Sequence, residues 1–467
     1  MALQIQPKTL SKIGYTNNVA RSLATLIISK YCKHDTKEHV IQILEQILDT
    51  PQPFVDDEIW GKLARHFCPP EETKVFSVYE LREKALAFKT YGGKYIETIA
   101  KEQMGLAMRL PVSLAGALMA DAHVGYGLPI GGVLAVDHAV IPYAVGVDIG
   151  CRMSLSVLEE NPAFLSRYAF QIKQALKENT HFGMEGGILF PQEHEILERT
   201  EFQTDAFLKN LRGKAVRQLG SSGGGNHFVE MGELELFDEN CLGLPAGSYA
   251  ALLSHSGSRG LGTEIAHRYS EIAREQCRLP KEAGHFAWLD LDSEAGQSYW
   301  MSMSLAGDYA QACHERIHIN MAKALGVKIQ TTIGNHHNFA WKERLENGQE
   351  AIVHRKGATP AHTGEPGIIP GSMTTSGYLV QGCGISESLY SASHGAGRAM
   401  SRQKAKENFT QSALKKMLTG AGVQLIGGSV EEAPPAYKNI DRVMDFQKEL
   451  VNIQGKFRPR IVRMNEE

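Results

Sequence analysis

The sequence predicts an α+β fold with a small helical appendage at its N-terminal end. Two segments, 18–32 and 36–49, show the apolar periodicity of amphipathic helices, and two prolines follow the second. From about residue 75 onward, apolar runs of strand type alternate with clusters of glycine. We therefore expect residues 1–75 to form a helical N-terminal extension and residues 76–467 to form a separate, larger domain.

The larger domain combines strand-type and helical segments. Its most apolar strand-type segments are 128–136, 139–151 and 377–385. Residues 301–325 and 401–418 are each expected to form a long helix, and the polar stretch 173–214 to form surface helix and loop. Clusters of glycine occur in the same motifs as histidine, aspartate and cysteine. Because glycine lets the backbone approach a ligand and present its N–H groups, this coincidence predicts binding sites in the glycine-rich loops.

Composition places few limits on the binding partners. The net charge is −3 and 43% of the residues are hydrophobic, so the chain can bury a large core but has no overall positive field. Nucleic-acid binding needs only a local basic stripe, and basic stretches occur at 398–406 and 456–463. The seven cysteines include no CxxC pair, which argues against a disulfide framework and fits a reducing cytosol. With no signal core and no apolar run of transmembrane length, we expect a cytoplasmic protein without a membrane anchor.

A set of separated residues has the chemistry of a metal site. Asp148 and Cys151 lie three residues apart in VDIGC, where we expect a strand to pass into a loop. His227, His255 and His337 each stand beside small or amide residues, in GGGNHFVE, SHSGSRG and GNHHN. One such histidine is more often structural than a ligand, but three of them with a carboxylate and a thiol indicate a metal site. The mixed donor set suits a borderline metal such as Mn, Zn or Fe, and two metals that share Cys151 would use all five side chains.

Two further motifs suggest chemistry at phosphorus. In SASHGAGR, His394 is followed by two glycines and Arg398, so its imidazole could attack phosphorus while backbone N–H groups and a guanidinium hold the phosphate oxygens. The alternative is a glycine-rich turn with a surface histidine. In DAHVGYGLPIGG, Asp121 precedes a histidine by two residues and is followed by four glycines. The alternative for this motif is a turn capped by the aspartate.

The segment His314-Glu315-Arg316-Ile317-His318 matches the HExxH motif of zinc proteases within a predicted helix. The extension that would supply a third histidine is missing, since INMAKALG follows, and Glu343 could at most serve as a third ligand. We prefer an exposed helix face with polar neighbours one turn apart. The sequence also has no Walker A motif and no Lys-x-Asp-Gly motif of lysine-based nucleotidyl ligases.

Taken together, the motifs resemble the RtcB family of RNA ligases. They occur in the family's order as DAHVGYG, GVDIGC, GGGNHF, HSGSRG, HHN, HRKGA, PGSM and SHGAGR, and the resemblance extends from about residue 75 to about residue 455. It implies mixed sheets around a central metal cleft, so that 76–467 would be the ligase catalytic domain. It also implies a GTP- and Mn²⁺-dependent reaction that joins RNA 2′,3′-cyclic phosphate or 3′-phosphate ends to 5′-hydroxyl ends. The intermediates would be a histidine–GMP adduct and a 3′-guanylylated RNA.

The resemblance assigns roles residue by residue. Five residues match the ligands of two Mn²⁺ ions, with the cysteine in the bridging position. They are Asp148, Cys151, His227, His255 and His337. His337 is preferred to His336 because it directly precedes Asn338. His394 matches the histidine that accepts GMP, and Asp121 matches a carboxylate that orients it. The positions that match nucleotide contacts are Asn226, Glu230, Ser372, Ser376, Gly395, Ala396, Gly397, Arg398 and Tyr437, and those near phosphates or RNA are Arg259 and Lys356.

Some expectations from the resemblance stay open. Family members typically end in Lys-Gly, with the lysine over the guanine, whereas this sequence ends in RPRIVRMNEE, so we expect weaker discrimination of guanine. RNA ends, from tRNA halves or damaged RNA, would be the partners, with an archease-like activator as a further candidate. The alternative from another functional class is a noncatalytic or repurposed RNA-end binder on the same scaffold.

Overall fold

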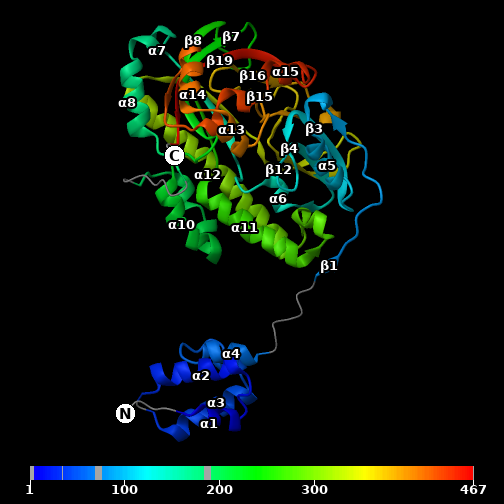
Figure 1. Cartoon of the computed structure of the whole chain (residues 1–467), viewed down its shortest axis with the longest axis vertical. Coiled ribbons are helices and arrows are strands. Elements are labelled where there is room, and N and C mark those ends of the chain that lie inside the picture. The colour runs from blue at the N-terminus through cyan, green and yellow to red at the C-terminus, as the bar shows by residue number, and fades with distance from the viewer. Residues whose placement is uncertain (1–4, 34, 69–75, 184–190, 466–467) are drawn as a thin grey trace. The chain divides into compact units, whose positions relative to one another are not determined.

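The computed structural model divides the chain into two compact units, Met1–Val75 and Phe76–Glu467, which we describe separately (Figure 1). The described residues are 5–33, 35–68, 76–183 and 191–465. None of the helices within these ranges combines the length and the apolarity needed to cross a bilayer.

The N-terminal unit is helical. Its helices are α1 (Pro7–Lys12), α2 (Asn18–Tyr31), α3 (Lys37–Asp49), η1 (Gln52–Phe54) and α4 (Gly61–Phe67). The predicted helices 18–32 and 36–49 correspond to α2 and α3. The side chain of Thr36 caps α3 by accepting a hydrogen bond from the backbone N–H of His39. The apolar faces of these helices meet in a small core that includes Leu44 and Trp60, so this unit buries a hydrophobic cluster of its own.

A large mixed sheet forms one wall of the second unit. Its strands, in spatial order, are β11 (Ile329–His336), β6 (Arg152–Leu158), β8 (Gly247–Ser256), β7 (Phe228–Leu236), β19 (Val451–Met464), β16 (Gly377–Gly382) and β15 (Pro366–Ile369), with β18 (Gln424–Ile426) pairing to β19. Neighbours along this order are antiparallel, and β18 runs parallel to β19. Arg152 pairs with both His336 and Ser256. The start of β6 and the ends of β11 and β8 therefore lie side by side.

A second sheet and several short strand pairs complete the β structure. The second sheet has the order β12 (Asn338–Arg344), β13 (Glu350–Lys356), β4 (Ile130–Val136), β3 (Ser113–His123) and β2 (Lys89–Thr90). The short pairs are β1 (Ser77–Val78) with β9 (Cys277–Arg278), β5 (Ala139–Val140) with β10 (Leu289–Asp290), and β14 (Ala358–Pro360) with β17 (Ser391–Ser393). The last pair matters for the site, because His394 follows β17 directly.

Helices pack against both sheets and against one another. The longer ones are α5 (Thr98–Ala107), α8 (Ala169–Asn179), α10 (Ala206–Gln218), α11 (Arg259–Gln276), α12 (Glu294–Leu325) and α14 (Gln411–Gly420). Helices α8 and α12 contact the large sheet, whereas α5 contacts β3 and β4 of the second sheet. The long helices α11 and α12 lie side by side in Figure 1. Ile317 and Met321 of α12 pack with Met231 and Leu252 of the sheet, so α12 shares a hydrophobic core with β7 and β8. Since alternate residues of a strand point to opposite faces, the residues between these contacts face away from α12.

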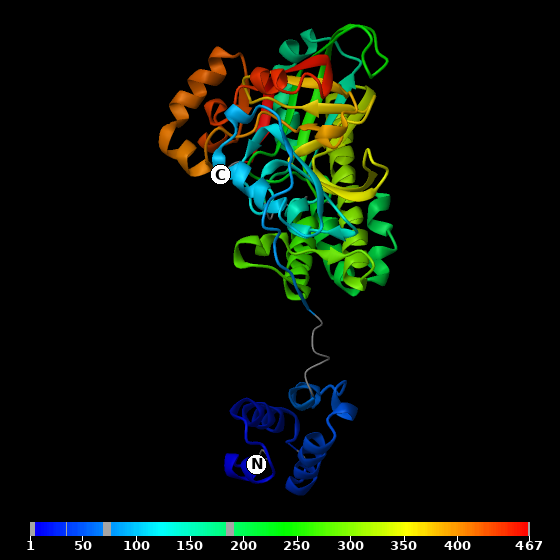
Figure 2. The same cartoon turned by 90° about the vertical axis from the view of Figure 1, so that its right-hand side faces the viewer.

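Shorter helices connect the main elements. They are α6 (Pro142–Val145), α7 (Ala163–Arg167), α9 (Glu201–Thr204), α13 (Arg402–Asn408), α15 (Ile440–Asp445), η2 (Gly93–Tyr95), η3 (Glu195–Glu198), η4 (Lys281–Phe286), η5 (Ser386–Ser388), η6 (Val430–Glu432) and η7 (Pro434–Ala436). Figure 2 shows the orange segment with α13 and α14 at one edge of the larger unit.

The α+β prediction is confirmed, and three predicted elements differ in detail. Residues 139–151 do not form a strand beyond Val140, because Pro142 starts the short helix α6. The single helix predicted at 401–418 is two helices, since Thr410 caps the start of α14 after α13 has ended. Helix α12 begins at Glu294, earlier than the predicted 301–325. The stretch 173–214 contains helices as predicted, and its residues 184–190 lie outside the described residues.

Candidate functional site

A cavity of about 390 Å³ is lined by residues of both sheets, including Leu253 of β8 and Lys356 of β13. The predicted site residues that line it are Asp148, Cys151, Asn226, His227, Glu230, His255, His337, Lys356, Ser372, His394, Gly395, Ala396, Gly397, Arg398 and Tyr437. Asp121, Ser376 and Arg259 are not part of the lining. Residues far apart in the sequence therefore share one cavity.

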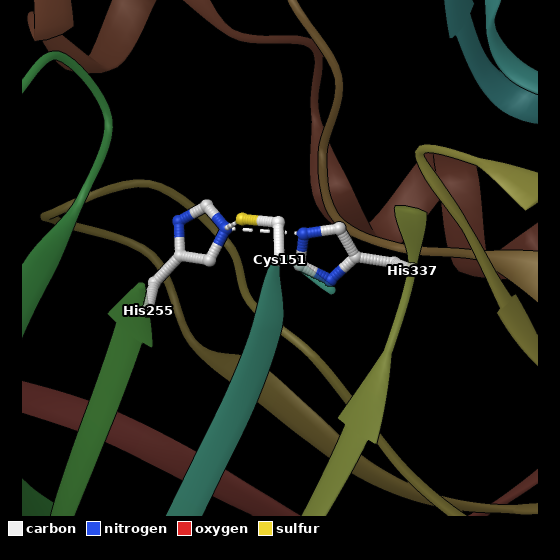
Figure 3. A group of neighbouring side chains, drawn as sticks. All are labelled: Cys151, His255 and His337. Carbon is white, nitrogen blue, oxygen red and sulfur yellow. Dashed lines mark hydrogen bonds between the residues drawn. The ribbon is translucent and has the colours of Figure 1, made fainter. Parts of the chain in front are cut away.

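The ends of three neighbouring strands bring Cys151, His255 and His337 together. Cys151 immediately precedes β6, His255 lies near the end of β8, and His337 immediately follows β11. The Cys151 thiol lies 3.2 Å from Nε2 of His255, and that Nε2 lies 3.2 Å from Nε2 of His337. Figure 3 shows the three side chains pointing toward one another from these strands. All three are buried, and their donor atoms converge as a metal site requires.

Cys151 also belongs to a second group with Asp148 and His227. The His227 Nε2 atom lies 3.0 Å from Oδ2 of Asp148 and 3.4 Å from the sulfur of Cys151. Ligand atoms around one metal ion are typically about 3.4 Å apart, given bond lengths near 2.1 Å and tetrahedral angles. The two candidate groups have the Cys151 thiol in common, and their side chains fit the binding of a metal cofactor. Asp148 and Cys151 lie in the turn before β6, not at the end of a strand as the sequence suggested.

The protonation states of the cluster favour a cation. Burial, together with the charge of His227, lowers the pKa of His255 to about 3, and burial lowers the pKa of His337 well below its usual range. Both rings are therefore neutral near pH 7. The Nδ1–H of His255 donates to the backbone carbonyl of Asn226 at 3.0 Å, which leaves the Nε2 lone pair directed at the cluster.

The two acidic groups of the cluster have opposite shifts. Burial raises the pKa of Asp148, but the hydrogen bond and charge of His227 outweigh it and lower that pKa to about 2. Burial and the nearby charge of Asp148 raise the pKa of the Cys151 thiol well above its usual value. A bound cation reverses this preference, because a coordinating thiol is deprotonated. Metal binding should therefore release a proton from Cys151.

His394 is held by the buried carboxylate of Asp121. The ring Nδ1 of His394 lies 2.7 Å from Oδ2 of Asp121, which also accepts from the backbone N–H of His394 at 3.1 Å and of Gly395 at 3.3 Å. Burial raises the pKa of Asp121, but the charge and hydrogen bond of His394 and the charge of Lys438 leave it lowered. The ring centroid of His394 lies 5.0 Å from that of His337. The oriented imidazole thus adjoins the group of Cys151, His255 and His337.

Glycine at 397 is required by this arrangement. Gly397 has a φ of +72°, and a Cβ there would lie 2.1 Å from the backbone oxygen of Asp121. Any side chain would both strain the backbone and push the Asp121 strand away from the loop. The glycine-rich loop therefore allows Asp121 and His394 to meet.

Comparison with known proteins places the chain in a family. A family model described as "tRNA-splicing ligase RtcB" matches residues 103–465. The chain belongs to the RtcB family. The protein named "RNA-splicing ligase RtcB1" from Escherichia coli is 30% identical over 390 residues, which cover 77% of this chain and 93% of that protein. The "tRNA-splicing ligase RtcB" of Methanococcus maripaludis is 31% identical over 399 residues, covering 70% and 83%, and the "RNA-splicing ligase RtcB" of Mycobacterium tuberculosis is 31% identical over 397 residues, covering 71% and 92%.

Within this RtcB member, the adjacent histidines 336 and 337 differ in surroundings. His337 joins the cluster, whereas Nε2 of His336 accepts a hydrogen bond from Arg152 at 3.3 Å and its ring lies against Phe339. His336 does not line the cavity. The position of His337 in the cluster agrees with the preference for this residue over His336. That His337 binds a metal stays a prediction.

The candidate nucleotide contacts differ in how exposed they are to the cavity. Glu230 is buried on β7, and burial raises its pKa to about 8, so it is protonated at neutral pH. The Tyr437 hydroxyl donates to Glu432, and the Arg398 guanidinium donates to the same carboxylate at 3.2 Å. Arg398 is thus held by protein groups, and a phosphate would have to compete with Glu432 for it. Asn226 lines the cavity and supplies the carbonyl that orients His255.

The serines of PGSMTTS lie in the turn between β15 and β16. The Ser372 hydroxyl lies 3.0 Å from that of Thr375, and both residues line the cavity. Ser376 lies outside the lining, while its neighbours Thr375 and Gly377 contribute to it. The structure therefore places Ser372 at the site but gives Ser376 no direct contact with the cavity.

The two basic residues expected near phosphates are both bound to backbone carbonyls. Lys356 donates to the carbonyls of Tyr126 and Tyr143, and burial lowers its pKa to about 8. Arg259 donates to the hydroxyl of Ser221 at 3.1 Å and to the carbonyl of Gly183, at the start of α11. Lys356 lines the cavity, whereas Arg259 does not.

The HExxH segment is not on an exposed helix face, as the sequence suggested. His314 and His318 are both buried, and all four ring nitrogens lie within hydrogen-bond distance of serine groups. Glu315 pairs with His194 at 3.1 Å, and Glu343 pairs with Arg355 at 2.6 Å. The buried serines, which are distant in the sequence, explain the error. With its nitrogens occupied, this segment does not form a protease zinc site.

Sequence reasoning missed several residues at the site. Lys438 donates to the carbonyl of Ala122 at 2.6 Å, next to Asp121, and its charge helps to lower the pKa of that aspartate. Tyr126 and Glu432 line the cavity. Tyr126 lies in the DAHVGYG motif and could have been considered there, whereas nothing local in the sequence distinguishes Lys438 or Glu432.

Proposed function

We propose that this RtcB family member is a GTP- and Mn²⁺-dependent RNA ligase that joins 2′,3′-cyclic phosphate or 3′-phosphate ends to 5′-hydroxyl ends. The observation that carries the proposal is the position of His394, which Asp121 orients and which adjoins the Cys151–His255–His337 group. The relatives are named as RNA-splicing or tRNA-splicing ligases, which supports this activity.

The proposed first step uses His394 as a nucleophile. Asp121 accepts the hydrogen bond from Nδ1–H and leaves Nε2 with a free lone pair. Nε2 forms a bond to the α-phosphorus of GTP as the bond to the bridging oxygen breaks and pyrophosphate leaves. The ligands for Mn²⁺ would be Asp148, Cys151, His227, His255 and His337, and the metal when bound would neutralise phosphate charge. Asp121 stabilises the positive charge that develops on the ring.

The remaining steps transfer GMP and then release it. A 2′,3′-cyclic phosphate is first opened by water to a 3′-phosphate. An oxygen of the RNA 3′-phosphate attacks the phosphorus on His394, the P–N bond breaks, and the ring recovers its lone pair. The 5′-hydroxyl of the second RNA then attacks the phosphorus of the activated 3′-phosphate and gives its proton to solvent, while the P–O–P bond to GMP breaks and GMP leaves. A 3′-phosphate needs such activation because it lacks a good leaving group.

The test is formation of a covalent nucleotide adduct. The protein is incubated with α-labelled GTP and Mn²⁺, denatured, and assayed for label and for the acid lability of a phosphoramidate. We expect His394→Ala to abolish the label, whereas His362→Ala, at a partly buried histidine outside the cavity, should retain it. An adduct of full yield in His394→Ala would refute the assignment. No adduct in the wild type would favour the noncatalytic RNA-end binder.

Several finer points stay predictions. They include cytoplasmic localisation, an archease-like activator, tRNA halves or damaged RNA as the substrate, and a role for the N-terminal unit. Weaker discrimination of guanine also stays a prediction, and residues 466–467 lie outside the described residues.

A further inference from the structure

The residues on either side of His255 face helix α12. Ser254 and Ser256 lie on β8, where alternate side chains point to opposite faces, so they face α12 while His255 faces the cavity. The Ser254 hydroxyl lies 2.6 Å from Nδ1 of His314 and 2.7 Å from Nε2 of His318. Nε2 of His314 lies 3.2 Å from the carbonyl oxygen of Ser256. Two buried histidines of α12 thus hold the strand immediately before and after the ligand.

The contacts continue across the neighbouring strands. Nδ1 of His318 lies 2.7 Å from the hydroxyl of Ser156 on β6, which lies 2.7 Å from the hydroxyl of Thr332 on β11. This series of hydrogen bonds therefore links β6, β8 and β11, the three strands next to Cys151, His255 and His337. It runs on the face of the sheet opposite to His255.

The Ser256 carbonyl and the neutral state of the two rings together set the direction of these hydrogen bonds. The Ser256 carbonyl can only accept, so His314 donates from Nε2, and its neutral ring accepts at Nδ1 from the Ser254 hydroxyl. Ser254 then accepts from Nε2–H of His318, and His318 accepts at Nδ1 from the hydroxyl of Ser156. In this arrangement each neutral ring has a defined tautomer. Burial lowers the pKa of both histidines, which agrees with neutral rings.

A second set of contacts from α12 reaches the other two ligand positions. Arg152, which follows Cys151, donates to Oε1 of Gln311 at 3.0 Å and to Nε2 of His336 at 3.3 Å. His336 immediately precedes the third residue of the group. Gln311 in turn donates to Glu315 at 2.8 Å. Helix α12 therefore contacts, directly or through Arg152, a neighbour of each member of the Cys151 group.

We propose that His314 and His318 of α12, with Gln311, are positioning residues for the metal centre: they fix the strand ends that present Cys151, His255 and His337. This inference rests on the proposed function, because it assumes that these three side chains bind a metal. It also gives a role to the HExxH segment, in which the ring nitrogens of His314 and His318 form hydrogen bonds with serine groups. Mutation of a residue that orients a metal ligand without itself binding the metal typically weakens metal affinity about 10–100-fold.

The test uses Co²⁺ alone as the probe. Its visible absorption reports coordination geometry, and a thiolate-to-cobalt charge-transfer band reports Cys151. His314→Phe removes both contacts while keeping a ring. His314→Gln retains a donor for the Ser256 carbonyl, and His314→Asn retains an acceptor for the Ser254 hydroxyl. The control is Tyr309→Phe, which removes a buried 2.7 Å hydrogen bond from the same helix to the carbonyl of Ala215, away from the sheet.

We expect His314→Phe to bind Co²⁺ about 10–100-fold more weakly and with an altered visible spectrum. Each amide variant should recover part of the affinity. Tyr309→Phe should lower the thermal stability of the metal-free protein without changing the spectrum or the affinity. A folded His314→Phe with wild-type affinity and spectrum would overturn the inference. If that variant does not fold, unchanged affinity and spectrum in both amide variants would do so.

The same titration separates this inference from the proposed function. If the wild type shows no thiolate band, or if Cys151→Ala retains it, the metal centre itself is wrong and the positioning role is overturned with it. If the wild type shows the band and Cys151→Ala loses it, the metal centre stands. The His314 variants then decide the positioning role alone.

Discussion

One carboxylate oxygen of Asp121 holds both the ring and the backbone of His394. Oδ2 lies 2.7 Å from the ring Nδ1 and 3.1 Å from the backbone nitrogen of the same residue. Asp121 is fully buried, so no water competes for this oxygen. The geometry selects the tautomer with a proton on Nδ1 and leaves Nε2 free, as a nucleophile at phosphorus requires.

Asp121→Asn tests this relationship. The amide keeps the size of the side chain but removes the charge that stabilises the ring once phosphorus is bound, and it can present an N–H to Nδ1 and select the wrong tautomer. We expect adduct formation with GTP to slow by about 10²–10⁴-fold, the range typical of a positioned acid or base. Rapid-quench measurement of the labelled adduct gives the rate. A rate within a few-fold of wild type would show that Asp121 does not orient the nucleophile.

Cys151→Ala should remove metal from both ligand groups at once. Cys151 is the member that the two groups share, so its loss leaves each group with only two of its donors. The loss of affinity should exceed the roughly 100-fold upper range that outer partners produce. Elemental analysis after dialysis measures the bound metal, and Cys277→Ala, at another buried free cysteine, is the control. Unchanged metal content in Cys151→Ala would rule out the shared thiolate.

The individual site residues were more predictable than their supporting contacts. The candidate metal ligands and His394 each lie in a short glycine-rich motif, so their chemistry was visible locally. Antiparallel pairing of β6, β8 and β11 then brings the distant motifs to one edge of the sheet. The sequence did not show this register, because it depends on pairing between strands that are distant in the sequence, such as Arg152 with Ser256 and with His336.

Predictions that depended on tertiary packing were less accurate. The spacing of His314 and His318 places them on one helix face, but whether that face is exposed depends on Ser156 and Ser254 of the sheet. Predicted helix ends were shifted or missed where a single capping residue determines where a helix begins, as Thr410 does for α14. The α+β class needed only the hydrophobic patterns, and was predicted correctly.

Glu230→Gln should stabilise the metal-free protein in a pH-dependent way. Burial raises the pKa of Glu230 to about 8, against about 4.3 for an unfolded glutamate. The unfolded chain therefore loses its proton first, and the native state becomes less stable as pH rises from about 4.3 to about 8. Gln has no proton to lose, so at pH 7 the variant should be more stable by roughly 2–4 kcal/mol.

The gain should vanish below pH 4, where both states of the wild type are protonated, and should level off above about pH 8. Chemical denaturation of both proteins across this pH range measures the difference. Glu233→Gln, on the same strand and paired with Arg460, is the control and should not gain stability as pH rises. Equal stability of wild type and Glu230→Gln at pH 7 would contradict a protonated, buried Glu230.

Tyr126 is an exposed aromatic side chain at the cavity. Tyr126 is 75% exposed, and it lines the cavity that contains His394. The backbone carbonyl of Tyr126 accepts a hydrogen bond from Lys356, which also donates to the carbonyl of Tyr143 at 3.2 Å. The loop is thereby held in place while the ring stays free. Exposed aromatic rings of this kind are the usual platforms on which single-stranded RNA bases stack.

Tyr126→Ala should therefore weaken RNA binding and leave nucleotide activation intact. Stacking of one base on an aromatic ring is worth about 1–3 kcal/mol, so we expect the KM for the RNA 3′-phosphate strand to rise about 10-fold. The yield of the GTP adduct should not change, because Asp121, and not Tyr126, holds His394 through hydrogen bonds to its ring and backbone. Tyr126→Phe keeps a stacking face and should retain the wild-type KM, and Tyr95→Ala, an exposed aromatic outside the cavity, is the matched control. Steady-state ligation and adduct assays on the same preparations distinguish the outcomes. An unchanged KM in Tyr126→Ala would exclude stacking, while a loss of adduct would place Tyr126 in the nucleotide site instead.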